Sequence, residues 1–156
     1  MNLIWNKIVT FWHQFGMEKI PPGATDECIE DFELRYQVKL PPDLRDYFKA
    51  ANGTGGLWDQ NFNCFWSIEE VKPVHLELVP NSINQYHYPD QFSYPNCFVF
   101  ADHCISCWLY AVRLTEDPLQ MAPVYRVTGD TTPGEKLSES FLDFMQRYLE
   151  NPDLIL

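Results

Sequence analysis

Residues 29–48 read IEDFELRYQVKLPPDLRDYF, and this stretch decides the fold. Apolar side chains recur at Ile29, Phe32 and Tyr36, which is the spacing of one buried face of an α-helix. The Pro41–Pro42 pair breaks this pattern, and a second amphipathic run begins directly after it. Two consecutive helices joined by a short proline-containing link are therefore predicted.

Signals on both sides set the ends of these two helices. Thr25 or Asp26 can act as the N-cap of the first. Proline suits the first turn of the second helix, and Asn52–Gly53 ends it, because glycine readily takes the left-handed position beyond a helix. The buried stripe of the second helix is expected to contain Leu44, Tyr47, Phe48 and Ala51.

The N-terminal part of the chain is strongly apolar. Residues 4–15 carry two adjacent apolar stripes, which predicts a short helix that must be covered on most sides. Since apolar helix faces are usually buried, we expect this helix to dock on its own domain. The alternative is that it offers surplus apolar surface to a partner. We divide the chain into this N-terminal extension, residues 1–20, and a main domain, residues 21–156.

Downstream of the helices the composition shifts towards aromatic and β-forming residues. Strands are expected at residues 57–58, 65–68, 97–101, 107–114 and 123–127, the third and fourth forming a hairpin. A short helix is expected within residues 69–78, a long loop over 80–95, and a last helix capped by Ser140 and closed by Pro152. Helices followed by strands and one final helix indicate an α+β domain with a mostly antiparallel sheet.

The charge of the chain excludes one class of partner. Eleven Lys and Arg stand against 22 Asp and Glu, a formal net charge of −11. Affinity for nucleic acid rests mainly on basic side chains that neutralise phosphates, so we expect no nucleic-acid partner. A basic protein suits this chain better. With 156 residues, 46% of them hydrophobic, the chain can form one domain with a sizeable core.

The cysteines and the apolar runs indicate where the protein works. Five cysteines, an odd number, do not form the disulfide framework of a secreted mini-domain, and we expect reduced thiols. The N-terminus lacks the basic start and small-residue cleavage site of a signal peptide. No run of about 18 apolar residues occurs, so no membrane-spanning helix is expected. These features favour a cytoplasmic protein that does not engage a membrane.

Motifs for metal binding and catalysis are weak. Cys104-x-x-Cys107, with His103 beside it and Cys97 before it, supplies only half of a tetrahedral zinc site. Free cysteines are commonly small buried residues, so we expect no metal; a redox role is a further alternative. The chain has no nucleophile elbow, P-loop or dinucleotide fingerprint. We therefore expect no cofactor and no catalysis.

Three stretches are candidate recognition surfaces. One is the acidic side of the helix near residue 26, with Asp26, Glu27, Glu30, Asp31 and Glu33. Another is the loop 81–95, with Tyr86, Tyr88, Asp90 and Tyr94. Rigid aromatics beside polar groups suit protein binding, whereas the alternative is that they fill a secondary core. The third comprises Trp58, Asp59 and Asn61, in the glycine-rich stretch after the helix that Asn52–Gly53 ends.

The same stretches resemble the SUKH superfamily. Residues 29–48, followed by Asn52–Gly53, are similar to its front signature of Phe-Glu, an aromatic, Leu-Pro, a second helix and Asn-Gly. Residues 98–102 and 108–112 resemble its central hairpin, and residues 140–144 resemble its closing helix. The superfamily often has a glycine-rich turn in that hairpin, whereas this chain has HCISC at residues 103–107.

The resemblance implies an α+β domain with a curved sheet that binds other proteins. Bacterial members of the superfamily neutralise the toxin domains of contact-dependent or secreted polymorphic toxins, while fungal relatives coordinate cell-wall synthesis and signalling. We therefore expect an immunity protein whose partner is a basic toxin domain, such as a nuclease. The alternative is a scaffold or regulator of the same superfamily without a link to a toxin. The oligomeric state stays open.

Overall fold

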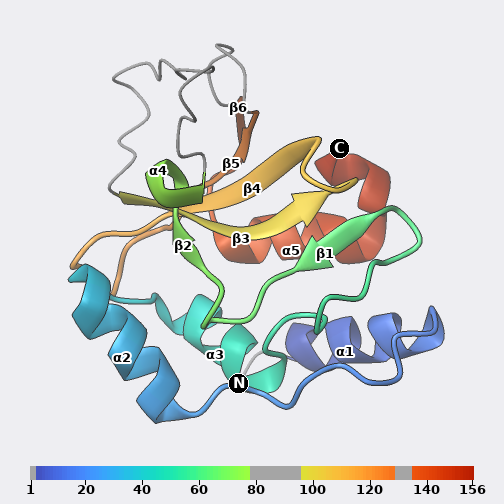
Figure 1. The fold of residues 1–156 in the computed structure, drawn as a ribbon, viewed down its shortest axis with the longest axis horizontal. Coiled ribbons are helices and arrows are strands. Elements are labelled where there is room, and N and C mark those ends of the chain that lie inside the picture. The colour runs from blue at the N-terminus through green and yellow to red at the C-terminus, as the bar shows by residue number, and fades with distance from the viewer. Residues whose placement is uncertain (1–2, 78–95, 129–134) are drawn as a thin grey trace.

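A sheet lies in the middle of the structure, and most helices lie on one side of it (Figure 1). The computed structural model describes residues 3–77, 96–128 and 135–156. The helices are α1 (Ile4–Gln14), α2 (Asp26–Tyr36), α3 (Pro42–Ala50), α4 (Val74–Glu77) and α5 (Phe141–Glu150), followed by a 3-10 helix (Pro152–Ile155). The strands are β1 (Asn63–Phe65), β2 (Lys72–Pro73), β3 (Cys97–His103), β4 (Trp108–Arg113), β5 (Val124–Val127) and β6 (Glu135–Ser138).

The strands form one antiparallel sheet in the order β1-β3-β4-β5-β6. β1 and β2 both pair with β3 and lie one after the other along its edge, Cys64 opposite Asp102 and Lys72 opposite Val99. β3 and β4 form the expected hairpin, with a register shift between Val99 and Ala101. The predicted α+β class and antiparallel sheet are confirmed.

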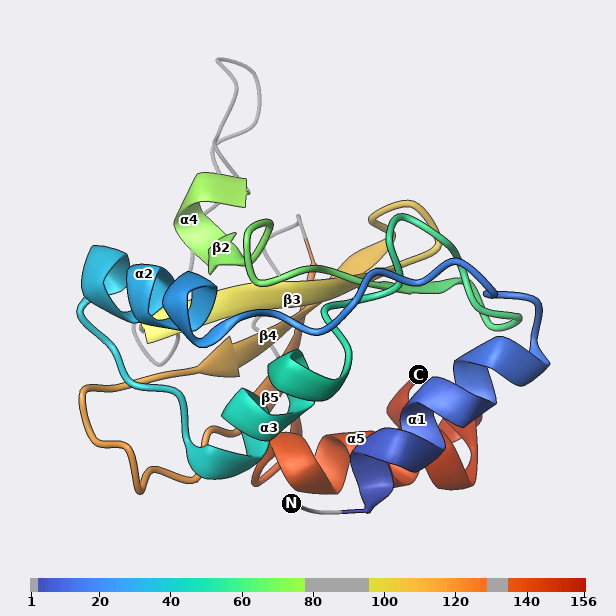
Figure 2. The ribbon, with the colours of Figure 1, turned by 90° about the horizontal axis from the view of Figure 1, so that it is seen from below.

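The two faces of the sheet carry different clusters, because successive residues of a strand point to opposite sides. Phe98 and Phe100 of β3 belong to the main core, which they share with α1, α2, α3 and α5. Cys97 and Val99 belong to a small apolar cluster with Val74 of α4. Figure 2 shows α4 on the opposite side of the sheet from α3 and α5.

Helix α1 docks on its own domain, as expected. Trp5 and Trp12 are fully buried in the main core. The ring of Trp5 packs edge-on against Tyr47 of α3, with centroids 5.5 Å apart. The indole Nε1 of Trp12 donates a hydrogen bond of 3.0 Å to the hydroxyl of Tyr148 in α5. These contacts make α1 part of the core.

Several local predictions from the sequence were right. Thr25 is the N-cap of α2, since its Oγ1 accepts a hydrogen bond of 3.1 Å from the backbone N–H of Cys28. Pro42 occupies the first turn of α3. Ser140 caps α5 by accepting a hydrogen bond of 3.1 Å from the N–H of Asp143.

The predictions between α3 and β3 were less accurate. Residues 57–58 lie in no strand, and within the described residues α4 spans only Val74–Glu77, directly after Pro73 of β2. Gly53 does not end α3, whose C-cap is the extended Ala51. Instead, Gly53 has φ +79°, and a Cβ there would lie 2.6 Å from the carbonyl oxygen of Phe65. Glycine therefore allows the backbone to pass close to β1. Strand β6 was not predicted from the sequence.

Candidate protein-binding surface

Helix α2 lies at the outer edge of the structure, beside β2 and α4 (Figures 1 and 2). Its inner face buries Ile29 and Phe32, and the ring of Phe32 packs edge-on against Phe98 of β3 at 5.5 Å. Asp26 in its first turn forms ion pairs with Lys49 of α3 at 3.1 Å and with Arg45 at 3.7 Å. The core and these ion pairs hold α2 in a fixed orientation.

The outer face of α2 carries a row of three exposed carboxylates, Glu27, Glu30 and Asp31, which we call the acidic ridge. Within the ranges of residues that the structure describes, none of the three forms an ion pair with a basic side chain. Their negative charge therefore faces solvent without a basic group at ion-pair distance. Asp26, in contrast, is exposed but already paired.

Glu33 does not belong to this outer face, and the expectation that it does was wrong. It is only 4% exposed. Its Oε2 accepts a hydrogen bond of 2.8 Å from the backbone N–H of Leu40, and its Oε1 pairs with the guanidinium of Arg45. Glu33 lies four residues after Ile29, one helical turn further on, and so shares the buried side. Its carboxylate holds the α2–α3 connection together.

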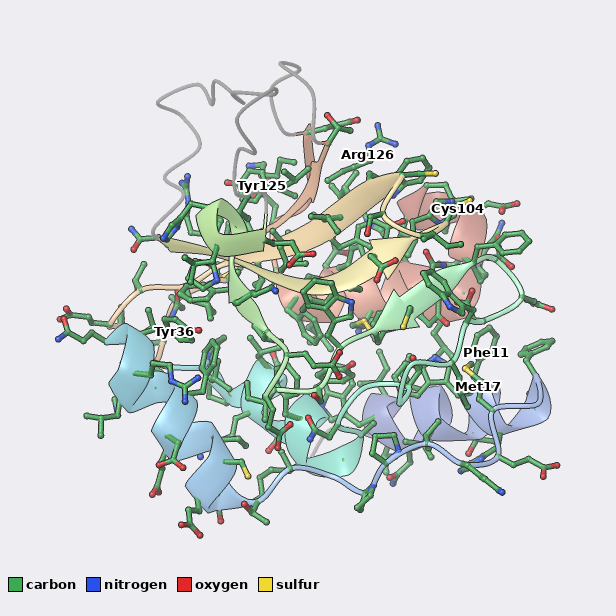
Figure 3. The ribbon with its side chains drawn as sticks, in the orientation of Figure 1. Phe11, Met17, Tyr36, Cys104, Tyr125 and Arg126 are labelled. Atoms are coloured by element: carbon green, nitrogen blue, oxygen red, sulfur yellow. The ribbon has the colours of Figure 1, made fainter. Side chains whose placement is uncertain are left out.

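A groove runs between α2 and the segment that leads into α4. It has a volume of about 420 Å³. Tyr36, which lies between α2 and the sheet in Figure 3, and Trp66 supply apolar surface, and Arg35 lies on the α2 side. Lys72 on the opposite side pairs with Glu77 at 2.6 Å. The groove is further lined by Glu69, Glu70 and Val71.

Glu69 keeps its negative charge in this groove. Partial burial disfavours the charged form, but hydrogen bonds outweigh this effect and lower the pKa of Glu69 below its usual value. The largest of these bonds comes from Asn52, whose Nδ2 donates to Oε2 at 3.0 Å. Glu69 therefore adds a fixed charge to the side of the groove that faces α2.

A second hollow, of about 450 Å³, lies at the C-terminal end of α2. Gln37 ends the helix in a left-handed conformation with φ 55°, and the chain then turns towards α3. Leu34, which is 81% exposed, and Val38 give the hollow apolar surface, while Glu30 and Glu116 give it negative charge. The hollows near the acidic ridge therefore combine apolar side chains with charges of both signs, because Lys39 lines one of them and Arg35 and Lys72 line the other. Such mixed polar and apolar surfaces are common in protein interfaces.

Trp58 and Asp59 lie at the other end of the sheet and differ in their exposure to solvent. Trp58 is 38% exposed, whereas Asp59 is only 4% exposed. The carboxylate of Asp59 accepts hydrogen bonds from the N–H of Asn63 at 2.8 Å and from the hydroxyl of Tyr148 at 2.6 Å. The expectation that Asp59 is surface-exposed was therefore wrong, because its carboxylate organises the loop before β1.

Apolar side chains that the sequence did not single out surround this end of the sheet. Phe62 and Ile105 are 62% and 84% exposed. The carbonyl of Phe62 accepts a hydrogen bond of 2.8 Å from the N–H of Cys104, which joins the loop before β1 to the β3–β4 turn. Pattern analysis overlooks such residues because turns give no periodic signal.

The remaining predicted binding residues lie outside the described residues. These are Tyr86, Tyr88, Asp90 and Tyr94, and their role stays a prediction.

The cysteine and histidine residues of the possible zinc half-site lie in different places in the structure. Cys97 is buried at one end of β3, and Cys104 and Cys107 are exposed beyond its other end. His103 bonds through Nδ1 to the side chain of Asn63 at 2.9 Å, and its ring stacks on Trp108. Over residues 3–77, 96–128 and 135–156, no group of three or more His, Cys, Asp or Glu side chains could hold a metal ion. In the same ranges, no helix has the length and hydropathy needed to cross a membrane.

Comparison with known proteins connects this arrangement to a family. Residues 23–147, from just before α2 into the last turns of α5, match the SMI1 / KNR4 family (SUKH-1). No curated protein matches the sequence.

Proposed function

Because the chain belongs to the SMI1 / KNR4 family (SUKH-1), we propose that it is an immunity protein that binds a toxin domain and blocks it without catalysis. The acidic ridge is the observation that carries this proposal. Its three carboxylates project from a helix whose orientation is set by the core and by the ion pairs of Asp26. Such a rigid acidic surface suits a protein that must recognise one basic partner.

The charge of the chain indicates the chemistry of that partner. A net charge of −11 favours rapid association with a basic protein through long-range attraction. Nucleases are a suitable class, because their own surfaces must attract phosphates. We propose that the toxin domain contacts Glu27, Glu30 and Asp31 with basic side chains and places apolar groups in the bordering hollows. Neutralisation of such a toxin would take place in the cytoplasm.

Co-expression provides the test. Immunity genes must travel with the toxin they neutralise, so the DNA that flanks this gene identifies the candidate toxin. Its C-terminal domain is expressed in bacteria with and without this protein, and survival is counted. We expect growth only when the protein is present. Unchanged killing by a toxic neighbouring domain argues against immunity, and a stable complex with a housekeeping protein supports the scaffold function instead.

Charge-reversed variants locate the surface in the same assay. The test variant replaces Glu27, Glu30 and Asp31 with Lys. The control replaces Glu18, Glu139 and Glu150, three exposed acids elsewhere on the chain, with Lys. Each variant changes the net charge by six, from −11 to −5, because three charges of −1 become +1. We expect the test variant to lose protection and the control to retain it. Equal behaviour of the two would show that the acidic ridge is not the binding surface.

A further inference from the structure

The turn between β3 and β4 has an unusual backbone. Cys104, Ile105 and Ser106 have positive φ angles of 52°, 55° and 64°. The N–H of Cys107 donates to the carbonyl of His103 at 2.9 Å. The turn therefore has the hydrogen bond of one α-helical turn, between residues four positions apart, but its backbone angles are left-handed. Three consecutive non-glycine residues in this conformation are costly, most of all the β-branched Ile105.

Neighbouring groups maintain this conformation. The N–H of Cys104 donates to the carbonyl of Phe62 at 2.8 Å, and the N–H of Ser106 donates to the side chain of Asp102 at 3.3 Å. The turn is thus anchored to the loop before β1 and to its own strand. Backbone strain that persists under such constraint is concentrated at functional sites in proteins.

The turn brings two exposed thiols together. In a helical turn, residues three positions apart lie side by side, and Cys104 and Cys107 have this separation. The Sγ of Cys107 lies 3.0 Å from the carbonyl oxygen of Cys104. The thiol of Cys107 donates this hydrogen bond, which holds its proton, and the neighbouring Cys104 thiol also raises the pKa of Cys107, so we assign the first attack to Cys104. Cys104 lies at the outside of the sheet end, accessible to solvent (Figure 3).

The other three cysteines lie in different surroundings. Cys64 and Cys97 are buried, and desolvation raises the pKa of both thiols, which suppresses their reactivity. Cys28 is half-buried on α2, at the edge of the main core. Only Cys104 and Cys107 therefore combine exposure with a neighbouring thiol.

We propose that Cys104 and Cys107 form a thiol–disulfide site that is oxidised by small-molecule disulfides of the glutathione type. The thiolate of Cys104 attacks one sulfur of oxidised glutathione, which forms a mixed disulfide and releases the first reduced glutathione. Cys107 loses its proton to solvent, attacks the Cys104 sulfur and releases the second reduced glutathione. Two protein thiols are oxidised and one glutathione disulfide is reduced. The new bond closes the turn that carries Ile105 and fixes its left-handed form.

Mass spectrometry of the folded full chain tests this proposal. The protein is incubated with oxidised glutathione, free thiols are alkylated, and the peptide containing both cysteines is analysed. We expect the loss of two hydrogen atoms, no glutathione adduct and a monomeric product. A lasting adduct on the wild-type peptide, a disulfide-linked dimer, or a pair that stays reduced while Cys28 reacts would overturn the proposal.

Single substitutions assign the order of attack. C107S is expected to accumulate a glutathione adduct at Cys104, since the second thiol is missing. C104S keeps the backbone carbonyl of residue 104 that accepts the hydrogen bond of the Cys107 thiol, so it is expected to form an adduct at Cys107 several-fold more slowly. C28S, the matched control, is expected to oxidise like the wild type. Faster adduct formation at Cys107 in C104S than at Cys104 in C107S would refute the assigned order. Circular dichroism checks that all three variants are folded.

Discussion

Replacing Glu33 with Ala should destabilise the protein, whereas replacing Glu30 with Ala should not. The two residues have the same chemistry and lie three positions apart on α2, but Glu33 is buried and Glu30 is exposed. Because each variant exchanges Glu for Ala in the same helix, the difference in helix propensity cancels in the comparison. The difference between the two variants therefore reports what the Glu33 carboxylate contributes through its surroundings.

The magnitude follows from the two partners of that carboxylate. Loss of Oε2 leaves the buried N–H of Leu40 without its acceptor, which costs about 1–3 kcal/mol. Loss of Oε1 removes the charge-assisted bond to Arg45, which is 31% exposed and retains Asp26, so we add only about 1 kcal/mol. The sum is about 2–4 kcal/mol. The corresponding change for Glu30 is within about 0.5 kcal/mol, as for most surface sites.

Urea denaturation followed by tryptophan fluorescence measures both values, because the buried Trp5 and Trp12 report unfolding. Glu33→Gln refines the result. It keeps an oxygen for the N–H of Leu40 and loses only the charge opposite Arg45, so its cost should be about 1–2 kcal/mol. If Glu33→Ala and Glu30→Ala have the same free energy of unfolding, Glu33 does not hold the α2–α3 connection and the reasoning is refuted.

Three further predictions concern the residues near β1 and the end of β3, namely Gly53, Tyr148 and His103. Gly53→Ala should destabilise the fold by about 1–3 kcal/mol more than Gly56→Ala, because both have φ +79° but only Gly53 faces backbone atoms within 3 Å; equal urea midpoints would contradict this. Tyr148→Phe should cost about 2–3 kcal/mol, since the buried carboxylate of Asp59 loses its shortest hydrogen bond and the buried indole N–H of Trp12 loses its acceptor, and a change below about 0.5 kcal/mol would argue against these bonds. Burial lowers the pKa of His103, so the unfolded chain binds the proton more readily and stability should fall as the pH drops below about 6.5. His103→Gln should flatten this pH dependence, and an unchanged profile would show that another group causes it.

Much of the fold follows from local signals in the sequence. Thr25 and Ser140 satisfy backbone N–H groups a few residues away, and Pro42 presets the first turn of α3, so each acts without help from distant residues. The β3–β4 hairpin likewise joins neighbouring stretches of chain. Such features are visible in a sequence because cause and effect lie within one or two helical turns.

Other features depend on residues that are far apart in the sequence. The buried carboxylate of Asp59 is stabilised by a hydrogen bond from Tyr148 of α5, and no sequence pattern near Asp59 indicates that this distant residue is its partner. Position 53 needs glycine because a Cβ there would collide with the backbone at the end of β1. The sequence around it indicates a different role, the end of helix α3. Within the described residues, strand β6 spans four positions, of which only Ser138 is buried, and so short a stretch gives no periodic signal.

The candidate surface was predicted in part. The acidic side of α2 follows from the sequence, but its division into exposed and buried members does not follow from charge alone. Helical spacing from Ile29 would have assigned Glu33 to the buried face. The groove beside α2 could not be predicted, because it depends on how the segment carrying Trp66 and Glu69 returns alongside the helix.

The association rate with the purified toxin domain tests the central claim most directly. The wild-type protein, the variant with Lys at positions 27, 30 and 31, and the control with Lys at positions 18, 139 and 150 are compared by stopped-flow fluorescence over a range of salt concentrations. We predict that reversal of the acidic ridge slows association at low salt by about 10-fold or more, that the control slows it much less, and that the rates converge at high salt. Equal rates for the two variants, or a wild-type rate that does not change with salt, would contradict the account.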